Sequence, residues 1–328
     1  MNFPEAQSEL KQLLSRVSPS ELPRLLDWIR TSEELDDLLV DNRRVMLQSI
    51  ADDLRASLPL DAMLPSETAA HHKMQQRSRP TVHVDSFLYD DEQVDSLCEE
   101  GTMSRTYCLT CGSFRTAPLD FISHSFSVSE LQFLFQSVLP DLSGCTLVDV
   151  GSRLGAVLYG GHVYSSASRL LGLELSEEFV RLQNNMLHKY RLNDRVQVLH
   201  ADVCTQDVLL QNTDVLVMNN VFEYFMEPDE QVRAWRFIMQ NFTKTGSLLV
   251  TVPSLQESLS ALQVFRPVLR RPHCSRVSDV IDLCDCHCVQ QEALRPGWVE
   301  ELPVDYDVYL GRDTDPDALR QIHLYRVM

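Results

Sequence analysis

The stretch CTLVDVGSRLGAVLYGG, residues 145–161, has the pattern of a buried strand that leads into a glycine-marked turn and then into a helix. Gly151 has the backbone freedom that a sharp turn requires, and Gly155 permits a close approach at the start of the helix. Backbone N–H groups at such a helix start can bind an acceptor such as a carboxylate. The stretch therefore predicts a strand–turn–helix unit with a ligand site at its turn.

This turn differs from two common phosphate-binding loops. A dinucleotide-binding loop reads Gly-x-Gly-x-x-Gly or Ala, whereas Arg153 occupies the position of the second glycine here. A P-loop of the type Gly-x-x-x-x-Gly-Lys is absent as well. Asp149, two residues before Gly151, suits a cationic ligand with an amino group better than it suits a pyrophosphate. The turn thus favours a ligand other than a pyrophosphate.

Short apolar runs alternate with helical patterns from Cys145 onward. This alternation predicts an α/β fold, a parallel sheet with helices on both faces. The tail, residues 304–328, differs, because two alternating segments around a polar turn predict an antiparallel pair at the sheet edge. The expected strands cover residues 146–150, 170–175, 196–200, 215–218 and 248–252, and the expected helices cover about 154–168, 176–191, 203–211 and 228–243.

Acidic residues follow two further expected strands. In a doubly wound sheet, ligands bind outside the carboxyl ends of the strands. Glu174 ends the second expected strand, where a carboxylate can accept hydrogen bonds from both hydroxyls of a ribose. Asp202 follows the third, where it can accept from an exocyclic amine while Ala201 and Val203 flank an adenine ring. Three successive strand ends therefore predict one adenosine site.

Five motifs occur in order: LVDVGSRLGA, LGLELS, LHADV, DVLVMNNVFEYF and GSLLVTVPS. Together they resemble the class I S-adenosylmethionine-dependent methyltransferases, over about residues 125–328. The resemblance implies a Rossmann-like, seven-stranded sheet with a reversed last strand. It also implies an active enzyme that uses S-adenosyl-L-methionine as its cofactor.

The resemblance assigns roles to individual residues. The methionine part of the cofactor would be lined by Asp149, Gly151, Ser152 and Gly155. The ribose would contact Glu174, and the adenine Asp202 and Val203. The end of the fourth strand would place Asn219 at the cofactor, and Asn220, Glu223 and Tyr224 near the reactive methyl group as candidate catalytic residues. A general base is needed only for a protonated acceptor, and Glu223, Tyr224 or His124 are the candidates.

Two positions depart from the family pattern. Arg153 replaces the middle glycine of the first motif, and Glu223-Tyr224 replaces the usual Glu-His pair. The long side chain of Arg153 would crowd the cofactor, point to the substrate side, or prevent binding. A catalytically silent methyltransferase-like interaction protein is therefore one alternative to the enzyme. A small-molecule methyltransferase and, less favoured, a nicotinamide-dependent dehydrogenase are the others.

Charge and composition narrow the partners. The chain has 328 residues and a formal net charge of −18 with neutral histidines, which opposes unaided nucleic-acid binding and favours a basic protein or peptide as the methyl acceptor. We expect no membrane span, because there is no run of eighteen apolar residues, and no secretory signal. Nine cysteines without such a signal suggest a reducing compartment, so the expected location is the cytoplasm, with the nucleus as the alternative.

The expected domain organisation has three parts. Residues 1–58 form a helical module, residues 59–104 a linker and lead-in, and residues 105–328 the methyltransferase domain with a cysteine-containing lead-in. In that lead-in, Ser127 or Ser129 would cap a helix, and His124 and Ser125 are weak site candidates. A structural zinc is an alternative that the sequence does not favour, and no metal ligands are assigned, because the spacing of the candidate ligands is incomplete. These candidates are Cys108, Cys111, Cys284, Cys286, His287 and Cys288.

Overall fold

The computed structural model describes residues 3–65, 67–68, 81–108, 116–118, 120–222, 226–264, 297–309 and 316–328. It divides the chain into two compact units, Met1–Met46 and Leu47–Met328. The first unit holds α1 (Phe3–Arg16), α2 (Leu22–Thr31) and the first part of α3 (Glu33–Ser57). These helices confirm the helical character expected for the first sixty residues.

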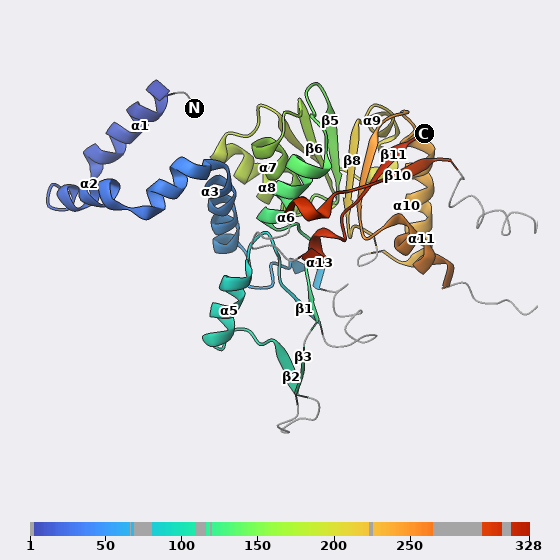
Figure 1. Ribbon diagram of the computed structural model, residues 1–328, viewed down its shortest axis with the longest axis horizontal. Coiled ribbons are helices and arrows are strands. Elements are labelled where there is room, and N and C mark those ends of the chain that lie inside the picture. Colours follow the sequence, from blue (N-terminus) through green and yellow to red (C-terminus); the bar gives the residue numbers. More distant parts are fainter. Residues whose placement is uncertain are drawn as a thin grey trace, which may run out of the picture. The chain divides into compact units, whose positions relative to one another are not determined.

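The second unit is built on a seven-stranded sheet with the order β10-β11-β9-β8-β5-β6-β7 (Figure 1). Strand β11 is antiparallel to both β9 and β10, whereas β7, β6, β5, β8 and β9 are parallel to one another. The α/β fold with a reversed last strand is therefore confirmed. The strands are β5 (Thr146–Val150), β6 (Arg169–Glu174), β7 (Val196–His200), β8 (Val215–Asn219), β9 (Leu248–Val252), β10 (Val299–Leu302) and β11 (His323–Val327).

Helices cover both faces of this sheet (Figure 1). On one face, the apolar side chains of the strands pack with Trp235 and Ile238 of α10 and with Leu255 of α11. Such burial on both faces explains why the parallel strands read as nearly continuous apolar runs. The principal helices are α6 (Val128–Phe133), α7 (Ala156–Tyr164), α8 (Glu177–Tyr190), α9 (Asp207–Gln211), α10 (Pro228–Asn241), α11 (Leu255–Val264) and α13 (Pro316–Leu319).

The tail differs from the expected hairpin. Residues Tyr306–Tyr309 form a 3₁₀-helix, and the strand that pairs with β11 is β10, which lies earlier in the chain. The Tyr306 hydroxyl donates to the Ile322 carbonyl at 2.9 Å, and its ring lies 6.1 Å from that of Phe133. These tertiary contacts outweigh the apolar alternation that suggested a strand here.

The division of the chain also differs from the expected one, because the second unit begins at Leu47. Its lead-in contains α5 (Asp91–Glu99), and β1 (Thr81–His83) pairs in parallel with β4 (Asp120–Ile122). A short antiparallel pair joins β2 (Thr106–Cys108) to β3 (Thr116–Pro118). Ala62 and Met63, in the expected linker, are buried. Burial of small and polar side chains, which leaves no apolar period in the sequence, brings this segment into the second unit.

The entry to the sheet agrees with the expected cap. Ser127 precedes α6, and its hydroxyl accepts a hydrogen bond from the Glu130 amide while the Glu130 carboxylate accepts from the Ser127 amide. This reciprocal arrangement satisfies two amides that the first helical turn leaves unpaired. The chain continues through a π-helix, Leu134–Val138, of which Leu134, Phe135 and Val138 are buried.

Candidate functional site

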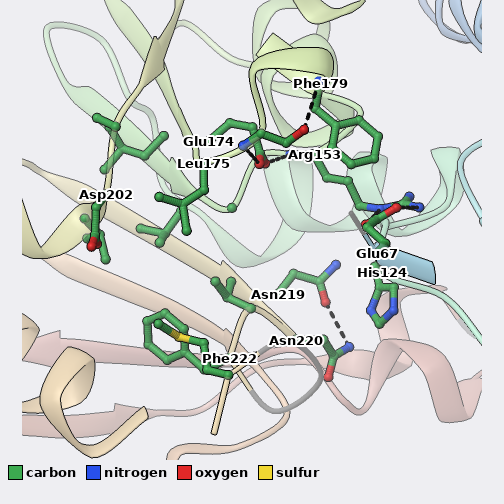
Figure 2. A pocket seen from close by; sticks show the side chains of 18 residues that line it. Glu67, His124, Arg153, Glu174, Leu175, Phe179, Asp202, Asn219, Asn220 and Phe222 are labelled. Carbon is green, nitrogen blue, oxygen red and sulfur yellow. Dashed lines mark hydrogen bonds and ion pairs between the residues drawn. The ribbon is translucent and has the colours of Figure 1, made fainter. Parts of the chain in front are cut away.

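A cavity of about 280 Å³ lies at the carboxyl ends of the central strands (Figure 2). Asp202 lies at one end of the cavity and Glu67 and His124 at the other, with Glu174 and Asn219 between them. Apolar side chains, including Leu175, Phe222 and Met226, complete the walls beside Gly151, Ala201, Val203 and Asn220. This is the place where open α/β sheets bind their ligands.

Gly151 holds the turn after β5 in a backbone conformation that glycine favours, with φ of 69°. Its amide donates to the Leu173 carbonyl at 2.8 Å, which ties the turn to β6. A Cβ atom at Gly151 would lie 3.0 Å from Cγ1 of Val221, another residue of the lining. The absence of a side chain at Gly151 therefore lets Val221 pack directly against the turn.

Gly155 and Ser152, two other predicted cofactor residues, are not part of the lining. Gly155 has φ of 88°, and a Cβ atom there would lie 2.8 Å from Cζ of the buried Tyr159 ring. The Ser152 hydroxyl is buried and lies 2.6 Å from the position that a Cβ of Gly172 would take. Gly155 thus makes room for Tyr159 of α7, and Ser152 packs against Gly172 of β6.

Asp149, predicted to line the methionine part of the cofactor, is buried in β5 and is also absent from the lining. Burial raises the pKa of this carboxyl well above its usual value, and the neighbouring charge of Glu174 raises it further. A carboxyl that does not reach the cavity cannot pair with a cationic amine bound there. Whether Asp149 lines the cavity or is buried behind it depends on side-chain packing, which the sequence motif does not specify.

Glu174 faces the cavity from the end of β6, as predicted. Its carboxylate accepts hydrogen bonds from the amides of Arg153 and Ser176, each at 2.8 Å. Burial raises its pKa, and the charge of Glu67 adds to the rise, while the amide donors oppose it. Two bonds leave acceptor capacity on this carboxylate, because its two oxygens offer about four lone-pair sites.

Asp202 lies at the end of the cavity opposite Glu67 and His124 (Figure 2). Val203 and Ala201, its neighbours in the chain, also line the cavity. Asp202 caps a short 3₁₀-helix, Val203–Thr205, and its Oδ1 accepts from the Cys204 amide at 2.8 Å. The cap fixes the carboxylate beside apolar wall groups, among them Leu175. The arrangement combines a polar edge with flat apolar contacts, which is what an adenine ring requires.

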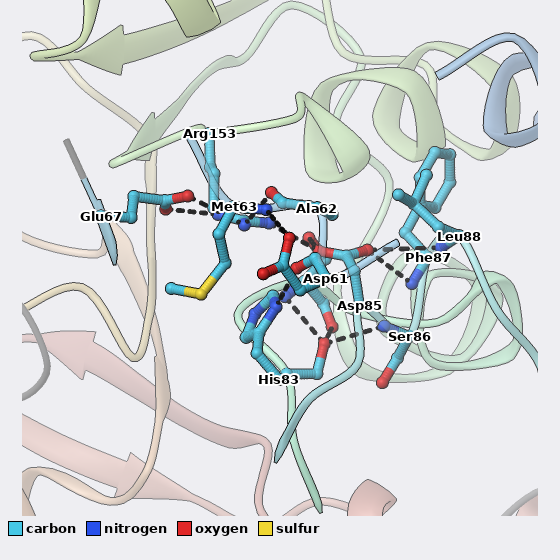
Figure 3. Close-up of polar contacts among 12 residues, drawn as sticks. Asp61, Ala62, Met63, Glu67, His83, Asp85, Ser86, Phe87, Leu88 and Arg153 are labelled. Atoms are coloured by element: carbon cyan, nitrogen blue, oxygen red, sulfur yellow. Dashed lines mark hydrogen bonds and ion pairs between the residues drawn. The ribbon is translucent and has the colours of Figure 1, made fainter. Parts of the chain in front are cut away.

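Arg153 leaves the turn toward the lead-in segment (Figure 3). Its φ is 45°, the left-handed conformation that explains why glycine is usual at this position. Nε lies 2.7 Å from Oε1 of Glu67, Nη1 lies 2.7 Å from Oδ2 of Asp85, and Nη2 donates to the Ala62 carbonyl at 2.6 Å. The lead-in therefore holds the Arg153 side chain at one end of the cavity, an arrangement that was not among the three considered for it.

Glu67 and Asp85 are residues that sequence reasoning missed. Both are buried, with side chains 8% and 0% exposed. They are 86 and 68 positions from Arg153 in the chain, so no local spacing connects them with the turn. The sole signal was an unpaired arginine in an otherwise apolar turn, which demands acidic partners from elsewhere.

Asn219 and Asn220 both line the cavity at the end of β8. Asn220 has φ of 50°, its amide donates to the Val252 carbonyl at 2.7 Å, and its side-chain amide donates to Oδ1 of Asn219 at 3.2 Å. Glu223 and Tyr224, the two other candidate catalytic residues, lie outside the described residues.

His124 lines the cavity at the Glu67 end and is buried. Its ring stacks on that of His83, with centroids 4.8 Å apart. Ser125 is not part of the lining, and its hydroxyl donates to Oδ2 of Asp85 at 2.7 Å. Of the two lead-in candidates, only His124 therefore reaches the cavity.

Neither a metal cluster nor a membrane span occurs in the part of the chain that the structure describes. No group of three or more His, Cys, Asp or Glu side chains there is placed to hold a metal ion. Cys98, Cys145 and Cys204 are free thiols. Cys111 and residues 284–288, which include most of the zinc candidates, lie outside the described residues. None of the described helices has the length and apolar character needed to cross a membrane.

Comparison with known proteins yields structural neighbours only. No family model and no curated protein matches the sequence. A putative S-adenosyl-L-methionine-dependent methyltransferase from Methanococcus maripaludis is 19% identical, with a TM-score of 0.33, and the match covers 42% of this chain and 60% of that one. An S-adenosylmethionine-dependent O-methyltransferase from Thermotoga maritima is 23% identical, with a TM-score of 0.32, and the match covers 44% of this chain and 52% of that one. Geranyl diphosphate C-methyltransferase from Streptomyces coelicolor is 14% identical, with a TM-score of 0.36, and the match covers 61% of this chain and 77% of that one.

The fold assignment rests on the sheet itself. A dinucleotide-binding sheet has six parallel strands in the order 3-2-1-4-5-6. Here an antiparallel strand, β11, is inserted between β9 and β10, which gives the order 3-2-1-4-5-7-6. The chain therefore has the class I methyltransferase fold, as the five motifs implied.

Proposed function

We propose that this protein binds S-adenosylmethionine in the cavity of Figure 2 and transfers its methyl group to a basic protein or peptide. One observation carries the proposal. Glu174, Asp202 and Asn219, each at or just after the end of a different strand, line a single cavity together with the Gly151 turn. Asp202 lies at one end of this cavity, and Glu174 and Asn219 lie between its two ends, a spread of polar groups that suits a ligand with an adenine, a ribose and an amino-acid end.

The residues present fit this cofactor. Asp202 offers an acceptor for the adenine amine, beside the apolar surfaces of Val203 and Leu175. Glu174 has acceptor capacity left for ribose hydroxyls. Gly151 brings its backbone to the cavity wall beside Val221. Carboxylates on the lining also favour a cation, and the cofactor carries a sulfonium charge.

When bound, the cofactor supplies an activated methyl group, so the protein's own task is mainly to position the acceptor. The side chains of Asn219 and Asn220 present amide groups to the cavity and can orient an acceptor there. His124 lies at the cavity end that we assign to the amino-acid part of the cofactor. If the acceptor is protonated, this imidazole is a candidate to take the proton.

The orientation of Arg153 supports an active enzyme over a catalytically silent protein. The silent alternative was motivated by an arginine in place of a glycine. The guanidinium is bound by Glu67, Asp85 and the Ala62 carbonyl, so it is held at the edge of the cavity. The net charge of −18 supports a basic acceptor, because opposite charge favours encounter.

Calorimetric titration with S-adenosylmethionine and S-adenosylhomocysteine tests cofactor binding directly. We expect both to bind, and we expect Glu174→Ala to weaken both at least 10-fold, through loss of charge-assisted hydrogen bonds. Glu178→Ala, on the exposed side of the first turn of α8, is the matched control and should bind as the wild type does. Absence of binding to either compound at millimolar concentration would refute the proposal.

Transfer of labelled methyl from the cofactor to fractions of a cell lysate tests the acceptor class. We expect label in basic proteins or peptides, and none with the Glu174→Ala variant. Label confined to small molecules would contradict the proposed acceptor but leave the cofactor site intact.

A further inference from the structure

We infer that Glu67, held in place by Arg153, binds the α-ammonium group of the cofactor's amino-acid part. This inference rests on the proposed function, and it makes the lead-in segment part of the cofactor site. Arg153 is then a positioning residue for Glu67.

The position of Glu67 agrees with this role. Glu67 lines the cavity at the end opposite Asp202, with Glu174 between them (Figure 2). An adenosine whose adenine is at Asp202 and whose ribose is at Glu174 directs its 5′ substituent toward Glu67. Asp149, the acidic residue of the first motif, is buried in β5 and does not reach the cavity. Another carboxylate must therefore receive a cation at this end.

The charges around Arg153 do not balance. One guanidinium faces two carboxylates, those of Glu67 and Asp85 (Figure 3). Asp85 is well satisfied and does not line the cavity, because its carboxylate also accepts from the Ser125 hydroxyl at 2.7 Å and from the Phe87 amide at 3.1 Å. Buried charges are normally paired, so the excess negative charge at Glu67 calls for a cation in the cavity.

Hydrogen-bond capacity points the same way. The carboxylate of Glu67 accepts from Nε of Arg153 at 2.7 Å, from Nη2 at 3.1 Å and from the Leu64 amide at 3.3 Å. These three bonds leave one of its roughly four acceptor sites open, enough for one N–H of an ammonium group. The guanidinium itself makes four side-chain hydrogen bonds and has five N–H donors, so it cannot also take a carboxylate in a two-bond grip.

Two probes separate this role from a structural one. S-adenosylhomocysteine carries the ammonium group, and 5′-methylthioadenosine has the same adenosine and thioether without the amino-acid part. Glu67→Gln is expected to lower the affinity for S-adenosylhomocysteine about 10- to 150-fold, the effect of one charge-assisted hydrogen bond. The affinity of the variant for methylthioadenosine should stay within about twofold of the wild-type value. Retained binding of methylthioadenosine also shows that the variant is folded.

Matched variants complete the test. Asp202→Asn should lower the affinity for both probes alike, because both carry adenine. Glu178→Gln should change the affinity for neither probe. If Glu67→Gln does not fold, as judged by circular dichroism, then Glu67→Asp replaces it. The Glu67→Asp side chain is one methylene shorter, so its carboxylate keeps the charge but lies farther from the cavity. The same selective loss of affinity for S-adenosylhomocysteine is expected.

Each other outcome overturns the inference. Unchanged affinity of the Glu67 variant for S-adenosylhomocysteine would remove Glu67 as a ligand. Equal losses for both probes in a folded variant would assign Glu67 to structure alone. Failure of the wild-type protein to bind S-adenosylhomocysteine would instead refute the proposed function, on which the inference depends.

Discussion

Replacing Arg153 by methionine should strongly destabilise the second unit. Methionine has a similar length and the same left-handed backbone cost at φ of 45°, so the substitution isolates the loss of charge. It would leave the carboxylates of Glu67 and Asp85, both almost fully buried, without their cation. Removing one partner of a buried ion pair typically costs about 3–5 kcal/mol, because the remaining charge stays desolvated.

Urea unfolding, followed by tryptophan fluorescence and circular dichroism, measures this cost. With a denaturant slope of about 3 kcal/mol per molar, a loss of about 3–5 kcal/mol lowers the midpoint by about 1–2 M. Arg105→Met is the control, since Arg105 pairs with Asp95 at 2.6 Å in an ion pair whose side chains are 45% and 64% exposed. Such exposed pairs contribute about 0–1 kcal/mol.

A double variant sharpens the interpretation. Adding Asp85→Asn to Arg153→Met removes one of the uncompensated charges, so part of the lost stability should return. Equal midpoint shifts for Arg153→Met and Arg105→Met would refute the reasoning. A double variant less stable than Arg153→Met alone would show that the loss has another cause than unpaired charge.

Two further predictions concern the first turn and the strand before it. Gly155→Ala should lower the free energy of unfolding, measured with urea, by about 1–3 kcal/mol more than Gly246→Ala does. Both glycines have positive φ, but only at Gly155 would the added Cβ meet Tyr159, at 2.8 Å. Equal losses of stability in the two variants would contradict a packing role for Gly155. The raised pKa of Asp149 means that the folded protein keeps a proton which the unfolded chain releases above about pH 4, so its contribution to stability falls as pH rises toward the folded pKa. Asp149→Asn should therefore gain stability relative to the wild type between pH 5 and pH 8, and a constant difference across that range would be the contrary result.

The sequence by itself determined the parallel part of the sheet and several residues of the cavity wall. Five parallel strands were predicted within a residue at either end, because strands buried on both faces read as short apolar runs between amphipathic helices. Asp149, Glu174 and Asp202 were expected to gather around one ligand, because parallel strands end at the same edge of a sheet. The structure brings Glu174 and Asp202 to one cavity, together with Asn219, but leaves Asp149 outside its lining.

Only the tertiary structure decided the partners of Arg153 and the boundary of the second unit. Glu67 and Asp85 come from a segment without apolar periodicity and meet Arg153 across 86 and 68 positions of chain. A local pattern records which face of an element is apolar, but it does not record which distant charge completes a buried ion pair. The raised pKa of Asp149 likewise follows from its burial and the nearby charge of Glu174, which the three-dimensional fold alone establishes.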